Sequence, residues 1–140
     1  LQASPPYTLH STPIFLYNEY GKPYLENGPC FSISHCKHAI AVAVSEIPIG
    51  IDIEHIRTAK PDLVAHTMNK EEQAHIWAAE SPDIAFTCLW TQKEAVLKMQ
   101  GTGIINDIKN TLVNIDNIHL QTHVNHSKQY VYTLAHGMKV

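Results

Sequence analysis

The chain has 140 residues and a mass of 15.7 kDa, enough for one compact domain, and 44% of its residues are hydrophobic, so it can bury a core. Ten Lys and Arg residues against thirteen Asp and Glu residues leave a net charge of −3, which argues against a nucleic-acid-binding module. No apolar run reaches the ~18 residues typical of a membrane-spanning helix, so we expect no membrane segment. The three cysteines are scattered and odd in number, which favours reduced thiols and a cytoplasmic location over a disulfide framework.

The first half of the chain is predicted to be rich in strands. Residues 1–20 hold three prolines among Ser and Thr, and we expect a linker there with one short strand at 14–17. Alternating or β-branched segments predict further strands at 31–35, 39–44 and 49–54. The segment at 39–44 is almost wholly apolar, so we expect both of its faces to be covered. We also expect it to pair in antiparallel fashion with the segment at 49–54.

Two helices are predicted in the middle of the chain. Asn69 followed by Glu72 forms a capping-box pattern, and the helix that it begins is expected to end near Glu80. A second helix is predicted from about residue 84 to residue 100, because Gly101 is typical of a helix C-terminus.

The last part of the chain alternates again and predicts antiparallel strands at 111–115, 118–124 and 130–135. Strands, then helices, then strands indicate an α+β fold, with an antiparallel sheet packed against two helices. His119 and His123 would be about 13 Å apart on such a strand, too far to share one metal ion, so we expect them to face solvent.

Two acidic residues interrupt the β-branched strand at 49–54. Asp52 and Glu54 occupy alternate positions, so their carboxylates point to one face about 6.6–6.8 Å apart. Such a pair suits a hard divalent cation such as Mg²⁺, held by one or two carboxylates together with substrate phosphates. The alternative is the solvated polar face of an edge strand.

The second predicted helix carries Glu94 and Lys98 one turn apart. This spacing is also that of an ordinary surface ion pair, which has no functional meaning. Alternatively, Glu94 supplies a third carboxylate to a metal and Lys98 binds phosphate as a point charge.

A possible anion site lies at the end of the strand at 31–35. Ser34 and His35 stand immediately before a loop that carries Lys37, and a hydroxyl, an imidazole and an ammonium group can together bind an anion. The alternative for His35 is an ordinary polar residue at the edge of a loop.

The combination of motifs resembles the 4′-phosphopantetheinyl transferase family, in its surfactin-synthetase-activator (Sfp-like) branch. The resemblance runs from about residue 20 to residue 104 and more loosely beyond. Its motifs are Gly21-Lys22-Pro23, Phe31-Ser32-Ile33-Ser34-His35, Gly50-Ile51-Asp52-Ile53-Glu54 and Trp90-Thr91-Gln92-Lys93-Glu94-Ala95-Val96-Leu97-Lys98.

The resemblance implies an enzyme of the holo-[acyl-carrier-protein] synthase type. Such enzymes transfer the phosphopantetheine arm of coenzyme A to a serine of an apo acyl or peptidyl carrier protein and release 3′,5′-ADP. It implies Mg²⁺, or Mn²⁺, on Asp52, Glu54 and Glu94, and catalytic roles for Glu94, Lys98 and Asp52, with Glu94 as the base. The implied coenzyme A ligands are Lys22, Ser34, His35, Lys93 and Lys98.

Members of this branch have two lobes, with the coenzyme between them. We therefore expect residues 1–20 to be a linker or the remnant of an upstream lobe, and residues 21–140 to form the C-terminal catalytic lobe. One alternative is a catalytically incompetent piece that only binds metal and phosphate. Another is a metal-dependent phosphohydrolase that uses the same carboxylates.

Overall fold

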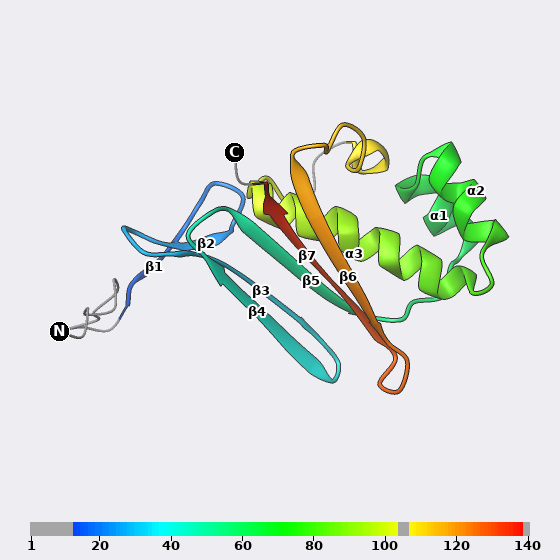
Figure 1. Ribbon diagram of the computed structural model, residues 1–140, viewed down its shortest axis with the longest axis horizontal. Helices are drawn as coiled ribbons and strands as arrows, with labels where there is room; N and C mark the ends of the chain where they lie inside the picture. The colour runs from blue at the N-terminus through cyan, green and yellow to red at the C-terminus, as the bar shows by residue number, and fades with distance from the viewer. Residues whose placement is uncertain (1–12, 104–106, 139–140) are drawn as a thin grey trace.

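The fold is built around a long helix that lies along one face of an antiparallel sheet (Figure 1). The structure is a computed structural model that describes residues 13–103 and 107–138. The sheet has the strand order β5-β7-β6, with β5 at Ile49–His55, β6 at Ile118–Asn125 and β7 at Tyr130–Gly137. Helix α3 (Pro82–Gln100) covers the face of this sheet that carries the acidic residues of β5.

Two hairpins precede the sheet. Strands β1 (Phe15–Tyr17) and β2 (Pro23–Leu25) form the first, so the part of residues 1–20 that the structure describes includes a paired strand. Strands β3 (Cys30–Cys36) and β4 (Ala39–Ser45) form the second. The expected strands at 14–17, 31–35, 49–54, 118–124 and 130–135 are confirmed, and with them the α+β fold class.

The predicted pairing of 39–44 with 49–54 is wrong, because β4 pairs with β3 and β5 pairs with β7. Strand β5 instead contacts β3 through serine side chains. The backbone amides of Ile51 and Ile53 donate to the hydroxyls of Ser32 (3.0 Å) and Ser34 (3.1 Å). These hydroxyls satisfy buried amides at the edge of β5 that does not face β7.

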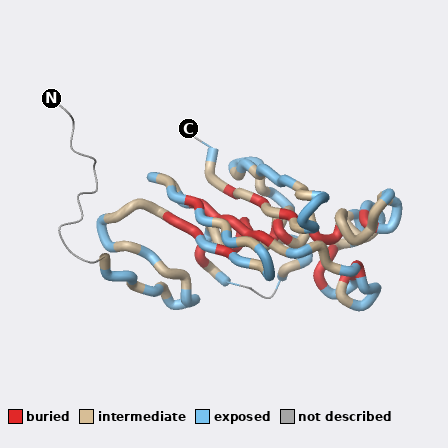
Figure 2. The backbone as a smooth tube through the Cα atoms, turned by 90° about the horizontal axis from the view of Figure 1, so that it is seen from below, coloured by how far each residue is buried: buried red, intermediate tan, exposed pale blue. Residues whose placement is uncertain are grey.

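The expectation that both faces of 39–44 are covered is also wrong. Ile40, Val42 and Val44 are exposed, at 78%, 58% and 63% of their accessible surface, while Ala43 between them is buried. The hairpin is thus covered only on the face that contacts β5. Along the backbone, the buried residues concentrate in the central strands and α3 (Figure 2).

Three α-helices are present in the described residues, where the sequence predicted two. The added helix is α1 (Pro61–Thr67), which has Pro61 in its first turn but no side-chain cap at Lys60, so its usual N-terminal signal is missing. Helix α2 (Lys70–Ala78) begins with the predicted capping box of Asn69 and Glu72. None of the described helices is long and apolar enough to cross a membrane.

Helix α3 begins at Pro82, slightly earlier than expected, because the Ser81 hydroxyl accepts a hydrogen bond from the amide of Ile84. It ends as predicted at Gly101, whose φ of 71° is left-handed.

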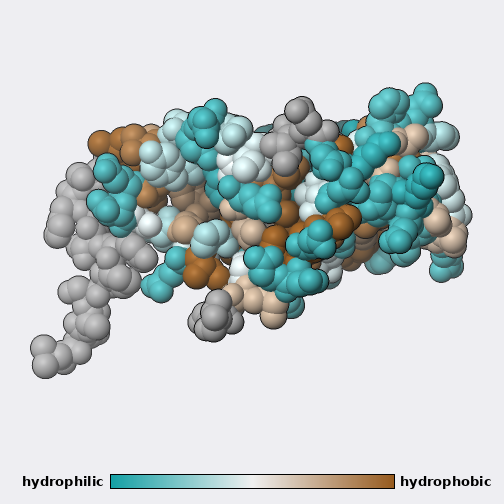
Figure 3. Space-filling view, turned by 90° about the horizontal axis from the view of Figure 1, so that it is seen from above, coloured by the Kyte–Doolittle hydropathy of each residue, from teal (hydrophilic) through white to brown (hydrophobic). Residues whose placement is uncertain are grey.

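The end of the molecule that carries α1 and α2 is mainly hydrophilic, whereas hydrophobic side chains gather in separate groups elsewhere (Figure 3).

The strand predicted at 111–115 does not form. A short 3₁₀ helix, η1 (Ile108–Asn110), and turns occupy this region. Leu112 packs against the core around Ala95 and Ala135, and Asn114 has a φ of 60°, which is incompatible with an extended strand. The alternating apolar residues of this segment pack a turn against the core and do not form a strand.

A glycine sets the distance between β5 and α3. A Cβ atom added to Gly50 would lie 2.0 Å from the Ala95 carbonyl oxygen and 2.5 Å from the Met99 amide nitrogen, both of them backbone atoms of α3. We therefore expect Gly50→Ala to lower the free energy of unfolding by about 3 kcal/mol, measured by urea denaturation. The control is Gly137→Ala, where the added Cβ meets nothing within 4 Å. Equal stability of the two variants would contradict this close contact.

Candidate functional site

A buried aspartate occupies the centre of the site. Asp52 lies on the face of β5 that packs against α3 and is only 3% exposed. Its Oδ1 accepts hydrogen bonds from the Ser34 hydroxyl (3.1 Å) and the Lys98 ammonium group (2.9 Å). Its Oδ2 is buried and has no hydrogen-bond partner. The alternative of a solvated polar face is therefore excluded for Asp52.

Two further carboxylates contribute to the same acidic environment. Burial raises the pKa of Glu94, and the negative charge of Asp52 raises it further. The pKa of Glu54 is raised by the same two causes in the same order. The Oε1 atom of Glu94 is also buried without a hydrogen-bond partner. Two unsatisfied carboxylate oxygens, on Asp52 and Glu94, thus remain in one crowded, negatively charged region.

A cavity of about 270 Å³ opens beside this region. Glu94 and Lys98 of α3 line it together with Lys22, which precedes β2. The Lys22 ammonium group donates hydrogen bonds to the carbonyl oxygens of Ile49 and Lys98, and burial lowers its pKa. The structure thus places two cationic side chains and a carboxylate around one opening. The remaining lining residues are Tyr20, Gly21, Pro23, Phe31, Ser32, Ile33, Leu97, Gly101 and Gly103.

The loop that carries Lys22 is fixed on the C-terminal end of α3. The Asn18 side-chain amide donates to the carbonyl oxygen of Gly101 (2.8 Å), and the Asn18 carboxamide oxygen accepts from the amides of Tyr20 and Lys22. These bonds satisfy a carbonyl at the end of the helix and hold Lys22 beside the cavity.

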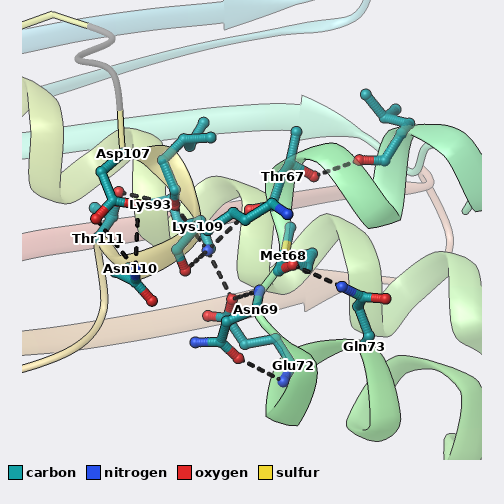
Figure 4. A network of polar contacts seen from close by, with 12 residues as sticks. Thr67, Met68, Asn69, Glu72, Gln73, Lys93, Asp107, Lys109, Asn110 and Thr111 are labelled. Atoms are coloured by element: carbon teal, nitrogen blue, oxygen red, sulfur yellow. Dashed lines mark hydrogen bonds and ion pairs between the residues drawn. The ribbon is translucent and has the colours of Figure 1, made fainter.

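Lys93 projects from a different side of α3 than Lys98 and does not line the cavity. It is fully buried, and its ammonium group bonds to Glu72 Oε1 (2.7 Å) and to the carbonyl oxygens of Thr67, Ile108 and Lys109 (Figure 4). Every ammonium hydrogen therefore has a protein acceptor. The expected contact of Lys93 with coenzyme A is not compatible with this burial. Lys93 joins α1, α2 and η1 to α3.

Ser34 and His35 do not converge on one anion. Neighbouring residues of a strand point to opposite faces, and here Ser34 is buried against Asp52 while His35 is exposed on the open face of the β3–β4 hairpin. The Ser34 hydroxyl is also occupied, because it donates to Asp52 and accepts from the Ile53 amide.

Sequence reasoning missed Ser32 and Arg57. Ser32 repeats the position of Ser34 two residues earlier on the strand, a signal that was available in the alternation. Arg57 lies over the ring of Trp90, 5.2 Å from its centroid, and its charge lowers the pKa of Glu54 and of Glu94 against the stronger effect of burial. Nothing in the sequence placed Arg57 near the carboxylates, because it follows the end of β5.

Among residues 13–103 and 107–138, no three His, Cys, Asp or Glu side chains are arranged as a ready metal cage. The two unsatisfied oxygens of Asp52 and Glu94 nevertheless fit a cation that takes one or two protein carboxylates and completes its shell with water or phosphate. The lysines beside the cavity suit a bound phosphate. Chemically, the site is able to hold a cation and a phosphate group together.

Comparison with known proteins agrees with this chemistry. The family described as the 4′-phosphopantetheinyl transferase superfamily matches residues 48–138. The chain is 37% identical over 95 residues to 4′-phosphopantetheinyl transferase gsp of Aneurinibacillus migulanus, covering 65% of this chain and 39% of that protein. It is 32% identical over 94 residues to 4′-phosphopantetheinyl transferase Sfp of Bacillus subtilis, covering 64% and 42%.

A third relative comes from another organism. 4′-Phosphopantetheinyl transferase AcpT of Salmonella typhi is 36% identical over 101 residues, covering 66% of this chain and 52% of that protein. The chain therefore spans between about two fifths and half of the length of these curated relatives.

The burial of Lys93 generates a stability prediction. Lys93→Met leaves the carboxylate of Glu72 without its ion-pair partner, so we expect the free energy of unfolding to fall by about 3–5 kcal/mol. Chemical denaturation followed by circular dichroism measures the change. Lys109→Met is the matched control, because that side chain is exposed and only its backbone carbonyl contacts Lys93. A loss equally large in the control would contradict the role of the buried ammonium group.

The raised pKa of Glu94 makes the stability of the native state depend on pH. Unfolding returns the pKa to its ordinary value of 4.5, so above that pH the native state binds more protons and its stability falls as pH rises toward the folded pKa. Glu94→Gln removes this loss, and we expect it to raise the free energy of unfolding at pH 7 by about 1 kcal/mol.

The gain from Glu94→Gln should disappear in acid, below the ordinary pKa of 4.5, where Glu94 is protonated in both states. Denaturant melts at pH 7 and in acid measure the gain and its disappearance, with the exposed Glu46→Gln as control. A stability gain that is the same at all pH values would show that the carboxylate charge is not its cause.

Proposed function

The chain belongs to the 4′-phosphopantetheinyl transferase superfamily, and from this premise we propose that it transfers the phosphopantetheine arm of coenzyme A to a serine of an apo carrier protein. One observation carries the proposal: Asp52, Glu94 and Lys98 converge from β5 and α3 beside a cavity, with carboxylate oxygens that lack partners. Under this proposal residues 21–140 form the catalytic lobe.

Mg²⁺ is the cation that we propose for the acidic region. Asp52 Oδ2 and Glu94 Oε1 would hold it, with Glu54 two residues beyond Asp52 on the same face of β5. When bound, it would supply positive charge next to the diphosphate of coenzyme A. Burial is the main cause of the raised pKa values of Glu54 and Glu94, and binding would offset the second cause, which is the repulsion from Asp52.

The lysines bind the phosphates in this proposal. Lys22 and Lys98 both line the cavity, and an ammonium group attracts a phosphate oxygen as a compact point charge. At about 270 Å³ the cavity lies below the ~300–1,000 Å³ typical of complete ligand pockets, so it suits the diphosphate part of the coenzyme. Lys93 and His35 are left out of this set, because Lys93 is buried elsewhere and His35 lies on the face of β3 opposite to Ser34 and Asp52.

Glu94 is the proposed general base. It lines the cavity in which the diphosphate would lie, so its carboxylate would lie close to the hydroxyl that attacks the diphosphate. The serine hydroxyl of the carrier protein attacks the phosphorus that bears the pantetheine arm and gives its proton to Glu94. The bond from that phosphorus to the oxygen of the departing 3′,5′-ADP breaks. Lys98 would neutralise the charge that develops on the leaving group.

The partners and the compartment follow from the same chemistry. The proposed acceptor is an apo acyl or peptidyl carrier protein, the acceptor class implied by the holo-[acyl-carrier-protein] synthase activity. We place the reaction in the cytoplasm, where reduced thiols persist, because Cys30, Cys36 and Cys88 are all unpaired.

The proposal is tested by transfer of labelled phosphopantetheine from coenzyme A to an apo carrier protein, using the full-length protein. We expect Asp52→Asn and Glu94→Gln each to lower kcat/KM by about 100-fold or more, because each removes a charge that faces the reacting phosphate. The exposed Asp116→Asn is the control and should keep full activity. Activity that survives both site substitutions overturns the proposal, and release of inorganic phosphate from simple esters would favour a phosphohydrolase instead.

A further inference from the structure

A pair of histidines lies on the sheet away from the acidic site. His119 of β6 and His136 of β7 are direct cross-strand partners, with ring centroids 5.1 Å apart. The residues next to them, Leu120 and Ala135, pack against α3, so the alternation of each strand places both histidines on the opposite face of the sheet. This pair is therefore separate from Asp52, which faces α3.

One of the two rings is already held in a metal-binding tautomer. His136 Nδ1 lies 2.9 Å from the carbonyl oxygen of Gly137, which can only accept a hydrogen bond. The proton is therefore on Nδ1, and the lone pair of Nε2 is available to a metal ion. A hydrogen bond from the second ring nitrogen to a backbone carbonyl is the usual support of a metal-ligating histidine.

The second ring has only a weak competitor for its lone pair. His119 Nε2 is 3.4 Å from the Gln121 side-chain nitrogen, which is longer than the ~2.7–3.2 Å of ordinary N–H bonds to an acceptor. His119 is also exposed, so its ring can turn toward His136 without leaving a packed core.

The separation of the rings suits one shared ion. With a metal–nitrogen bond of about 2.0–2.1 Å, an ion lies about 3.2 Å from the centre of each ligating ring, so rings up to about 6.4 Å apart can share it. The observed 5.1 Å is within this limit. Imidazole nitrogens select borderline ions, chiefly Cu²⁺, Ni²⁺ and Zn²⁺, over the hard Mg²⁺.

We propose that His119 and His136 form a second metal site, which binds a borderline divalent ion between β6 and β7 and leaves its other positions to water. Two ligands fixed on adjacent strands bind more tightly than either one alone, because the second bond forms within the molecule. The bound ion links the last two strands and stabilises the native state, because the unfolded chain does not hold the pair together.

Calorimetric titration of the full chain with Ni²⁺ tests this proposal. We expect a binding event that is tighter than any binding of Ni²⁺ to the carboxylates, and we expect His119→Asn and His136→Asn each to weaken it by about 100-fold. The matched control is His123→Asn, which changes a histidine on the same strand and face whose cross-strand partner is Tyr132. This control should bind Ni²⁺ as the unmodified chain does.

Two outcomes overturn the site. One is unchanged Ni²⁺ affinity in either pair variant, and the other is an equal loss in the His123→Asn control. Thermal melts without metal establish that each variant folds, and melts with Ni²⁺ should show a rise in Tm only where both histidines are present. Asp52→Asn should retain the Ni²⁺ site, so this test is independent of the proposed transferase activity.

Discussion

The close contact between β5 and α3 is the constraint on which the rest of the structure depends. Gly50 has no side chain, and its Cα lies where any Cβ would collide with the helix backbone at Ala95 and Met99. The acidic face of β5 is thereby held against the helix surface that carries Glu94 and Lys98. Without this approach, Asp52 would lose its ion pair with Lys98, and a buried carboxylate without a paired cation is strongly unfavourable.

Charge in this region is balanced only in part. Lys98 and Ser34 satisfy one oxygen of Asp52, while the second oxygen and one oxygen of Glu94 have no hydrogen-bond partner. Proteins rarely leave buried polar atoms unsatisfied, and such exceptions concentrate at functional sites. Burial and, after it, the negative charge of Asp52 raise the pKa values of Glu54 and Glu94, so binding a cation would stabilise the native state.

Two lysines of α3 have different roles, one in packing and one beside the cavity. Lys93 and Lys98 stand five positions apart and project from different sides of the helix. Lys93 is enclosed by four oxygen acceptors and holds α1, α2 and η1 in place, and burial lowers its pKa against the opposing effect of Glu72. Lys98 is partly exposed beside the cavity and pairs with Asp52.

Local signals in the sequence predicted much of the architecture. The capping box at Asn69, the glycine after α3 and the alternation in β5, β6 and β7 depend only on nearby residues, and each was confirmed. Helix α1, which the sequence did not predict, lacks a capping side chain, and the alternation at 111–115 belongs to a turn that packs inward. In both places the tertiary contacts outweighed the local pattern.

The sequence alone determined the α+β class and the family. It also identified the motifs around Asp52 and Glu94 as the ones that carry the reactive side chains, because residue spacing within one strand or helix is fixed by backbone geometry. Only the tertiary structure decided which motif residues meet. It placed Lys93 in the core, His35 on an open face and β5 beside β7, and it brought His119 next to His136. Strand order and helix rotation depend on contacts between distant segments, which the spacing within a motif does not specify.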